Sequence, residues 1–518
     1  MPGVAQYFGG YDYAMVLPII LLTLFALGIL LFDLMVPPEW KRLNAFVALG
    51  GLAFAASAIT GIPSWGWFRG IPGIYRHVEG LRLHGYSGQP AVAGSMLIDA
   101  FTVYFWSLFL GAAALAILIS VRYLDIEHEH HGEYYSLILF SVIGMMCMAA
   151  GVDIVLIFIG LELMAISTYV LVGFLRSNKR SNEAALKYLL LGAFSSGIFA
   201  YGLSLFYGLS GSTNLGVIAR ALEFQLRANG HASPVAVLAL LATMTGLFFK
   251  IAAIPFHQWA PDAYEGAPTS ITGYMSVAVK AAAWAMLLRI LLWGLGPLHE
   301  VWVPVVIFVS IATMTGANLA ALTQTNLKRL LAYSSIAHVG YILLALVAIG
   351  SAVSRESFQD GFKGILLYLL VYTFMNLGAF GVVTALRHRK VIGDEIDDIA
   401  GLYSRAPVEA VLMLIFLLSL AGIPPLAGFY GKYFVFLSLI ESGHYVLAAL
   451  GVAYSVFGLY YYLKIANAMF MREPLEKEPL PVSFGMRVAL GLAACGTVGI
   501  GIIPEPFIRA VNWSLGLG

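Results

Sequence analysis

Long apolar runs separated by short polar segments make up nearly the whole chain. Fourteen of these runs are long enough to cross the hydrocarbon core of a bilayer as α-helices, which takes about 20 residues. The fourth and fifth runs are separated only by Gly151 to Asp153 and are the least distinct. The pattern therefore predicts an all-α polytopic membrane protein. Its predicted spans are residues 13–36, 43–62, 98–121, 134–151, 153–175, 184–209, 236–256, 268–292, 302–323, 327–350, 363–386, 408–439, 444–471 and 485–508.

Two of the predicted spans contain proline within the apolar run. The seventh is interrupted around Pro255, and the twelfth is interrupted at Pro424 and Pro425. Proline frees backbone groups inside the membrane, which is tolerated only where the break faces protein or water. Paired breaks in corresponding positions are typical of transporters built from two repeats. The two breaks are five spans apart, so we expect spans four to eight and nine to thirteen to be the repeat units.

The polar segments are too short to form a separate soluble domain. The longest, near residues 63–97 and 210–235, are also rich in glycine. We therefore expect a single membrane domain over residues 1–518. Its parts would be the N-terminal helices (13–121), a first repeat (134–292), a second repeat (302–471) and a last helix (485–508).

The basic residues of the loops predict the orientation of the chain. One set of alternate loops carries almost twice as many Lys and Arg residues as the other, and the richer set is expected in the cytoplasm. Both termini would then lie on the periplasmic side of a bacterial inner membrane. The first apolar run follows no basic segment, so we interpret it as a span rather than a cleaved signal peptide.

Composition supports a membrane protein and excludes several functions. The chain is 60% hydrophobic and 11% charged, whereas a soluble domain has about 25% charged residues. A net charge of +1 argues against nucleic acid as a partner. The sequence has no nucleotide-binding loop, no haem motif and no cysteine cluster, and its two cysteines, Cys147 and Cys495, are not expected to form a disulfide. Uphill transport would therefore need energy from a partner or from a counter-ion gradient.

Five ionisable residues lie deep inside apolar spans. Each such residue costs at least about 2.5–3.5 kcal/mol, and the usual reason for keeping one is ion or proton traffic. Burial favours the neutral form of an amine, so a buried lysine can take up and release a proton. The five are Glu162, Lys250, Lys280, His338 and Lys432.

Each of these residues also has a structural interpretation. Glu162 could form an ion pair that fixes helix packing, and His338 could be a buried histidine satisfied by Ser334, Ser335 and Tyr341 at helical spacing. Lys250, Lys280 and Lys432 are too deep to reach the membrane surface, which favours a functional role.

Three further residues have less defined positions. Lys187 and Lys464 lie nearer the ends of their spans, where a lysine can extend to the surface. His257 follows the first proline break and could connect the two halves of that helix to solvent.

The segment from Glu127 to Glu133 is rich in His and Glu and superficially suggests a metal site. It lies in a loop and lacks the two histidines one turn apart, with a glutamate, that are typical of zinc proteases. We therefore interpret it as a solvated loop and expect no metal.

Four sequence stretches together resemble a known family. They are Glu183-Ala-Ala-Leu-Lys187, Pro255-Phe-His-Gln-Trp-Ala-Pro-Asp-Ala-Tyr-Glu-Gly-Ala-Pro-Thr269, Leu330-Leu-Ala-Tyr-Ser-Ser-Ile-Ala-His338 and Gly422-Ile-Pro-Pro-Leu-Ala-Gly-Phe-Tyr-Gly-Lys432. They look like the antiporter-like subunit N (subunit 2) of respiratory complex I. The resemblance covers about residues 98–471.

The resemblance implies a fold of fourteen helices with two inverted five-helix repeats, helices 4–8 and 9–13, in which helices 7 and 12 are broken. It implies a proton path along the membrane midplane in which Glu162 modulates Lys250. Lys280 would connect the halves, Lys432 would be the terminal lysine, and Lys187 and His338 would belong to the same polar axis. It also implies that NADH, FMN, iron–sulfur clusters and quinone bind to partner subunits. The neighbours in the membrane would be subunit M and, on the other side, small subunits.

Related families and functions remain to be distinguished. Subunit M typically has glutamate at the position of Lys432, and subunit L has a long C-terminal extension that this chain lacks. The closest alternative is a membrane subunit of a multisubunit sodium/proton antiporter without redox chemistry, although His257 and the Glu265 to Thr269 segment favour subunit N. A purely structural scaffold would require the buried lysines to be inert.

Overall fold

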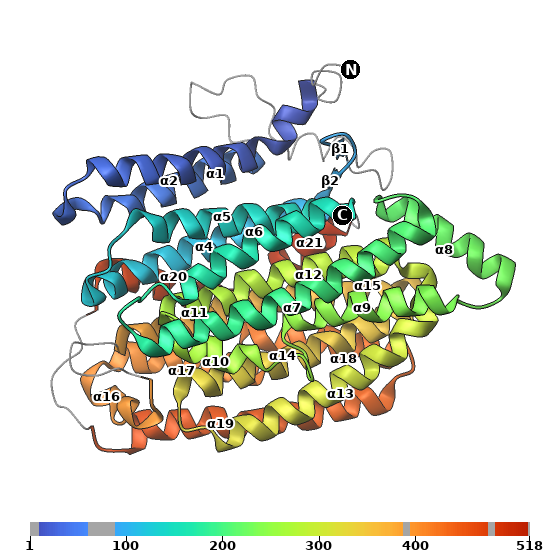
Figure 1. Cartoon of the computed structure of the whole chain (residues 1–518). Coiled ribbons are helices and arrows are strands. Elements are labelled where there is room, and N and C mark those ends of the chain that lie inside the picture. Colours follow the sequence, from blue (N-terminus) through green and yellow to red (C-terminus); the bar gives the residue numbers. More distant parts are fainter. Residues whose placement is uncertain (1–9, 61–88, 387–393, 475–481, 516–518) are drawn as a thin grey trace.

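Nearly all of the described chain is helical. The computed structural model describes residues 10–60, 89–386, 394–474 and 482–515. Within these residues, twelve helices are long and apolar enough to cross a membrane, and two shorter apolar helices span Leu43–Ile59 and Pro407–Ala421. Every predicted span contains a helix, and most helices lie side by side in one bundle (Figure 1). The all-α membrane architecture is therefore as predicted, while the number of crossings stays a prediction.

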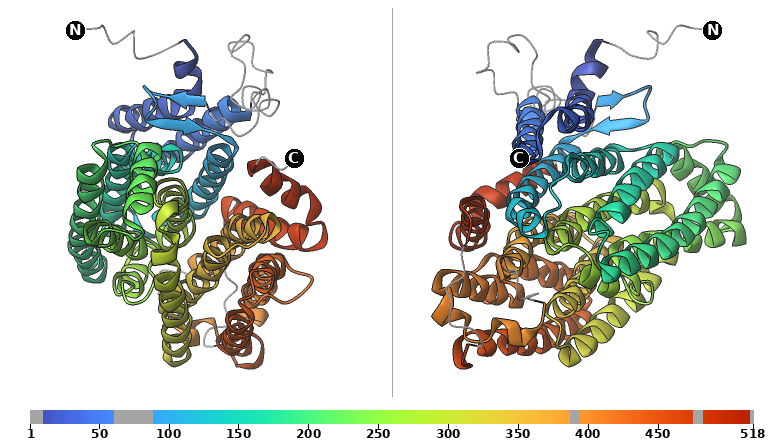
Figure 2. Two further views of the ribbon diagram at one scale, coloured as in Figure 1. Left: turned by 90° about the vertical axis from the view of Figure 1, so that its right-hand side faces the viewer. Right: turned by 60° about the vertical axis from the view of Figure 1, so that its left-hand side comes forward.

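The N-terminal helices form a layer on one side of the bundle. Helices α1 (Gly10–Met35) and α2 (Leu43–Thr60) pair with each other and lie against α4 (Ala100–Glu127) and α5 (Gly132–Ala150). Figure 2 shows this hairpin as a separate outer layer, above the other helices in both views. A short antiparallel hairpin of β1 (Gln89–Ala91) and β2 (Met96–Ile98) precedes α4.

The first-repeat region contains a broken helix and an irregular one. Helix α9 ends at Ile251, and the chain resumes as the short helix α10. The next span changes from α-helix to π-helix twice, in η4 and η5, and is 94% buried. The elements are α6 (Ile154–Val172), α7 (Lys179–Ser210), α8 (Leu215–Asn229), α9 (Pro234–Ile251), α10 (Trp259–Gly266), α11 (Thr269–Tyr274), η4 (Met275–Val279), α12 (Lys280–Leu288) and η5 (Arg289–Gly294).

The second-repeat region places two long buried helices, α14 and α15, at the centre of the molecule. They are 94% and 89% buried, so lipid cannot reach most of their side chains. The elements of this region are α13 (His299–Thr323), α14 (Leu327–Gly350), α15 (Arg355–Leu386), α16 (Leu402–Arg405), α17 (Pro407–Ala421), α18 (Ala427–Glu441) and α19 (Tyr445–Met471). Helices α20 (Phe484–Ile502) and α21 (Glu505–Ser514) follow it.

Some predicted boundaries are wrong. The seventh span was expected to end at residue 256, but its second half, α10, continues to Gly266. The last span was expected to reach residue 508, but α20 ends at Ile502 and a separate amphipathic helix, α21, follows. The polar segment 210–235 contains α8, a helix that projects at one end of the bundle (Figure 1). Hydropathy alone does not reveal α8, because only one stripe of its surface, including Leu215, Ile218 and Leu222, is buried.

Candidate functional site

The first broken helix holds Lys250 beside its break. Lys250 lies in the last turn of α9, and only 3% of its surface is exposed. Its Nζ donates a long hydrogen bond of 3.4 Å to the hydroxyl of Tyr169 on α6 and lies 5.8 Å from the centre of that ring. The backbone then turns through Ala252, which has a left-handed φ of 61°. The Lys250 amine therefore makes one long hydrogen bond within the described residues.

Protein side chains satisfy the backbone groups freed at this break. The indole Nε1 of Trp259 donates to the Phe249 carbonyl at 2.9 Å, and the Ile254 amide donates to Thr313 Oγ1 at 3.0 Å. These two bonds replace helical hydrogen bonds that the chain cannot make around Pro255. The predicted helix break at Pro255 is confirmed, and it faces the protein on the α13 side.

At the second broken helix, the lysine itself contacts the backbone at the break. Helix α17 ends at Ala421, the chain turns through Gly422 with φ 86°, and Lys432 of α18 reaches back to the break. Its Nζ donates to the Ala421 carbonyl at 2.8 Å and to Ser455 Oγ of α19 at 2.6 Å. A cation at a helix C-terminus interacts favourably with the helix dipole. Lys432 therefore caps the first half of its own broken helix. The predicted break at Pro424 and Pro425 is confirmed.

Glu162 lies on α6 and is partly buried. Its Oε1 is buried and has no hydrogen-bond partner among the described residues. No ion pair joins it to Lys250 in the described part of the chain, so the structural ion pair considered from the sequence is not formed here. An unsatisfied buried carboxylate oxygen is costly, which makes it a ready acceptor for a proton or for a lysine that moves.

Lys280 links the two regions that the sequence predicted as repeats. It follows the π-helical segment η4, and π-helical turns occur frequently at functional sites. Its Nζ donates to Ser335 Oγ of α14 at 2.5 Å and lies 5.6 Å from the ring centre of Tyr264. The buried amine of Lys280 is thus hydrogen-bonded to α14, a helix of the other predicted repeat region.

His338 is the centre of a small hydrogen-bond network on α14. Its Nε2 lies 3.0 Å from the hydroxyl of Tyr462 on α19, and its Nδ1 hydrogen-bonds with the hydroxyl of Tyr368 on α15 at 2.5 Å. Tyr462 also hydrogen-bonds with Ser334 at 2.5 Å. Hydroxyl groups and a neutral imidazole can each donate and accept a proton. Both ring nitrogens of His338 therefore have partners through which a proton could move.

The contacts on the two sides of Lys280 are of different kinds. Toward the second break, Ser335 precedes the His338 network by sequence alone: its neighbour Ser334 hydrogen-bonds with Tyr462 of that network. The Tyr341 ring lies 5.8 Å from the His338 ring and 5.1 Å from the Lys432 Nζ. Toward the first break, the contacts are ring to ring. Those contacts are Tyr169 with Tyr188, Tyr188 with Trp259 and Trp259 with Tyr264, at centroid distances of 4.6, 4.5 and 6.2 Å.

Lys187 and His257 lie outside this buried row. Lys187 is 47% exposed and pairs with Glu183 at 2.8 Å and with Asp262 of α10 at 3.1 Å. Asp262 also pairs with Arg329 at 2.7 Å, which ties α10 to the first turn of α14. His257 is half-buried in the loop between α9 and α10.

Several important residues were not identified from the sequence. Tyr169, Tyr368, Tyr462 and Ser455 contact the buried lysines or His338. Tyrosine and serine are common in apolar spans, so only the three-dimensional arrangement distinguishes them. Arg289 was also missed: its side chain is fully buried and pairs with Asp99 at 2.6 Å.

Among the described residues, no group of three or more His, Cys, Asp or Glu side chains is arranged to hold a metal ion. In the His-rich loop after α4, His130 pairs with Asp125 at 2.6 Å and His131 with Glu129 at 3.2 Å. Both cysteines, Cys147 and Cys495, are free.

Relatives of this chain are found over its whole length. It is 61% identical over 506 residues to NADH-quinone oxidoreductase subunit N 1 of Koribacter versatilis, an alignment that covers 98% of this chain and 96% of that protein. It is 50% identical to subunit N 2 of Solibacter usitatus, with 98% of each chain covered.

Solved structures share the fold. A chain of respiratory complex I from Thermus thermophilus with bound aureothin is 30% identical, with a TM-score of 0.74, and covers 95% of this chain and 99% of its own length. A chain of the Mrp complex from Dietzia has a TM-score of 0.79 at 19% identity and covers 98% and 97%. Fold similarity therefore does not separate complex I from the antiporters, whereas sequence identity does.

The family model described as NADH:quinone oxidoreductase/Mrp antiporter, transmembrane, matches residues 150–458. These residues include both breaks and the five ionisable residues that the sequence placed deep in apolar spans. Together with the full-length relatives, this match shows that the chain belongs to the family of antiporter-like N subunits of NADH-quinone oxidoreductase.

Proposed function

We propose that this chain conducts protons across the membrane as the antiporter-like subunit of an NADH-quinone oxidoreductase. The observation that carries the proposal is the buried row of amines and imidazole, Lys250, Lys280, His338 and Lys432, which crosses from one broken helix to the other. NADH, FMN, iron–sulfur clusters and quinone would act on partner subunits and supply the energy. Subunit M and small membrane subunits are the expected neighbours, and both termini would be periplasmic.

The proposed path begins at the first break. Lys250 has only a weak hydrogen bond to Tyr169, so its proton affinity depends strongly on nearby charge. Movement of the Glu162 carboxylate toward Lys250 would stabilise the ammonium, and movement away would release its proton. Each unit of pKa change corresponds to about 1.4 kcal/mol. Lys187, which is 47% exposed, and His257, which is half-buried, would connect Lys250 to solvent.

The second part of the path would run from Lys280 to Lys432. A proton leaving the Lys280 ammonium would pass to the Ser335 hydroxyl, and the Ser334–Tyr462–His338 network would carry it onward. Lys432 would receive it at the second break. Because Lys432 also caps α17, its loss of charge would weaken the bond to Ala421 and loosen the break. Proton arrival and helix position would thus be coupled at this end.

The substitution Lys280→Ala tests the proposal directly in the intact complex. We expect NADH-driven proton uptake into inside-out vesicles to fall, because the connection between the two repeats is removed. Arg180→Ala, a change at an exposed residue, is the control. Unchanged proton uptake in the Lys280→Ala complex would contradict the proposed path and favour the scaffold interpretation. Uptake of sodium without NADH oxidation would instead support the antiporter alternative.

A further inference from the structure

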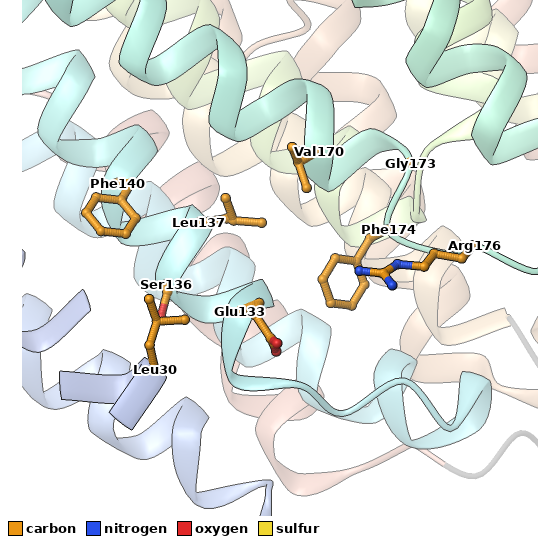
Figure 3. A pocket seen from close by; sticks show the side chains of 9 residues that line it. All are labelled: Leu30, Glu133, Ser136, Leu137, Phe140, Val170, Gly173, Phe174 and Arg176. Atoms are coloured by element: carbon orange, nitrogen blue, oxygen red, sulfur yellow. The ribbon is translucent and has the colours of Figure 1, made fainter. Parts of the chain in front are cut away.

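A groove on the outer face of the bundle is lined by residues that the proton path does not use. It has a volume of about 280 Å³ and lies along α5 and α6, next to Leu30 of α1 (Figure 3). Its walls are mostly apolar and include Leu137 and Val170. Val170 is 50% exposed, so the groove is accessible from the surrounding membrane.

One end of the groove carries two opposite charges. Glu133 lies in the first turn of α5, and Arg176 follows the end of α6. Both side chains are exposed, and within the described residues neither has an ion pair. In Figure 3 the ring of Phe174 is drawn between them. An unpaired cation and an unpaired anion therefore face the same groove at the level where α5 begins and α6 ends.

The apolar walls alone cannot select an occupant. Lipid tails are as apolar as leucine, so an acyl chain gains little by moving from bulk lipid into the groove. Selectivity must come from the charged end. A guanidinium group binds phosphate strongly and often with two hydrogen bonds. A carboxylate accepts charge-assisted hydrogen bonds from an ammonium group, but a choline headgroup has no N–H to donate.

We propose that this groove binds a phospholipid whose headgroup carries a primary ammonium, phosphatidylethanolamine. The phosphate lies at Arg176, the ammonium at Glu133, and the upper part of an acyl chain against Leu137 and Val170. The site would hold α6 in place against α1 and α5. Val170 directly follows Tyr169, the partner of Lys250, so the lipid supports the helix that carries Glu162. The proposal depends on the chain spanning a membrane and is independent of the proton path.

Photocrosslinking in native membranes containing the intact complex tests the site. The substitution Val170→p-benzoylphenylalanine places a crosslinker in the groove. A control is the same replacement at Leu186 on the neighbouring helix α7, which is 56% exposed and is not among the residues that line the groove. The lipid adducts of both are identified by mass spectrometry. The groove adduct should be enriched in phosphatidylethanolamine by about tenfold over the control, the factor that one charge-assisted hydrogen bond supplies.

Two further substitutions separate the roles of the charges. Arg176→Gln should remove the enrichment, whereas Arg180→Gln, a change at a nearby exposed arginine outside the groove, should leave it intact. Glu133→Gln should shift the adduct toward anionic phospholipids, because the carboxylate no longer repels them. A groove adduct with the same lipid composition as the Leu186 control would overturn the proposal. So would a crosslink to a protein subunit, which would show that a partner fills the groove.

Discussion

The two broken helices satisfy the same backbone requirement with different side chains. At the first break, Trp259 donates to the freed carbonyl of Phe249, which leaves Lys250 with a single long bond to Tyr169. At the second break, Lys432 itself donates to the freed carbonyl of Ala421. A neutral indole holds the first break, and a titratable amine holds the second. Loss of a proton should therefore change the backbone only at the second break.

The largest expected effect comes from removing each lysine. Lys250→Ala and Lys432→Ala should both lower NADH-driven proton uptake about tenfold or more, which corresponds to about 1.4 kcal/mol or more in the transfer barrier. Only Lys432→Ala should also destabilise the subunit, by about 1.5–3 kcal/mol, the typical value of a hydrogen bond to a charged group. Thermal unfolding of the purified complexes measures the difference. Equal destabilisation by both substitutions would show that Lys432 does not stabilise its break more than Lys250 does.

The turn residues of the two breaks provide a second comparison. A Cβ atom at Gly422 would lie 2.8 Å from Lys432 Cδ, and φ is 86° there. Gly422→Ala should cost about 1–2 kcal/mol of backbone strain and also displace the Lys432 amine, lowering proton uptake. The chain already has alanine in a left-handed conformation at Ala252, and Ala252→Gly should leave proton uptake near the wild-type value. Normal proton uptake in the Gly422→Ala complex would show that the close packing of Lys432 against residue 422 is not needed for proton transfer.

The tryptophan at the first break can be tested with a matched control. Trp259→Phe removes the indole donor to Phe249, whereas Trp284→Phe changes a buried tryptophan whose Nε1 has no partner among the described residues. Trp259→Phe should destabilise the end of α9 by about 0.5–1.5 kcal/mol more than the control, because the Phe249 carbonyl loses one of its two donors and keeps only the Ala252 amide. Faster amide hydrogen exchange in the last turn of α9 would be the readout. Similar exchange in both variants would show that Trp259 does not hold the break.

The smallest effect is expected in the network around His338. Tyr462 bridges His338 and Ser334, while Tyr368 contacts His338 alone among the hydrogen-bonding side chains of the network. Tyr462→Phe should therefore slow proton uptake more than Tyr368→Phe, by about two- to fivefold if one neutral hydrogen bond of about 0.5–1 kcal/mol is lost from the path. Measured rates in the opposite order would mean that the proton leaves His338 through Tyr368.

The sequence was sufficient for the membrane class and for the positions of the breaks, because long apolar runs and internal prolines have few alternative explanations. Lys250, Lys280 and Lys432 could be selected as buried because polar neighbours are scarce around them. The sequence could not show that Lys432 rather than a neutral residue holds the second break. That depends on how far α18 folds back over α17. The roles of Tyr169, Tyr368 and Tyr462 could not be predicted either, because each tyrosine contacts Lys250 or His338 from a different helix.

The end of a membrane span was the least predictable feature of the fold. Helix α10 continues beyond Pro255 in a segment that contains Asp262 and Glu265, whose charges suggested a loop. Arg329 pairs with both, at 2.7 and 2.8 Å. Arg329 of α14 therefore stabilises the two acidic residues of α10 within the bundle. A hydropathy profile cannot show this ion pairing, because it depends on a helix elsewhere in the sequence.

The central claim is that both breaks belong to one proton path. It is tested most directly by proton uptake in complexes carrying Tyr169→Phe, Ser455→Ala or both, which alter the contact of one lysine at each break. Steps in series are not independent, so the double variant should be no slower than the slower single variant within about twofold. Effects that multiply fully in the double variant would show that Lys250 and Lys432 act independently, and would contradict a single path.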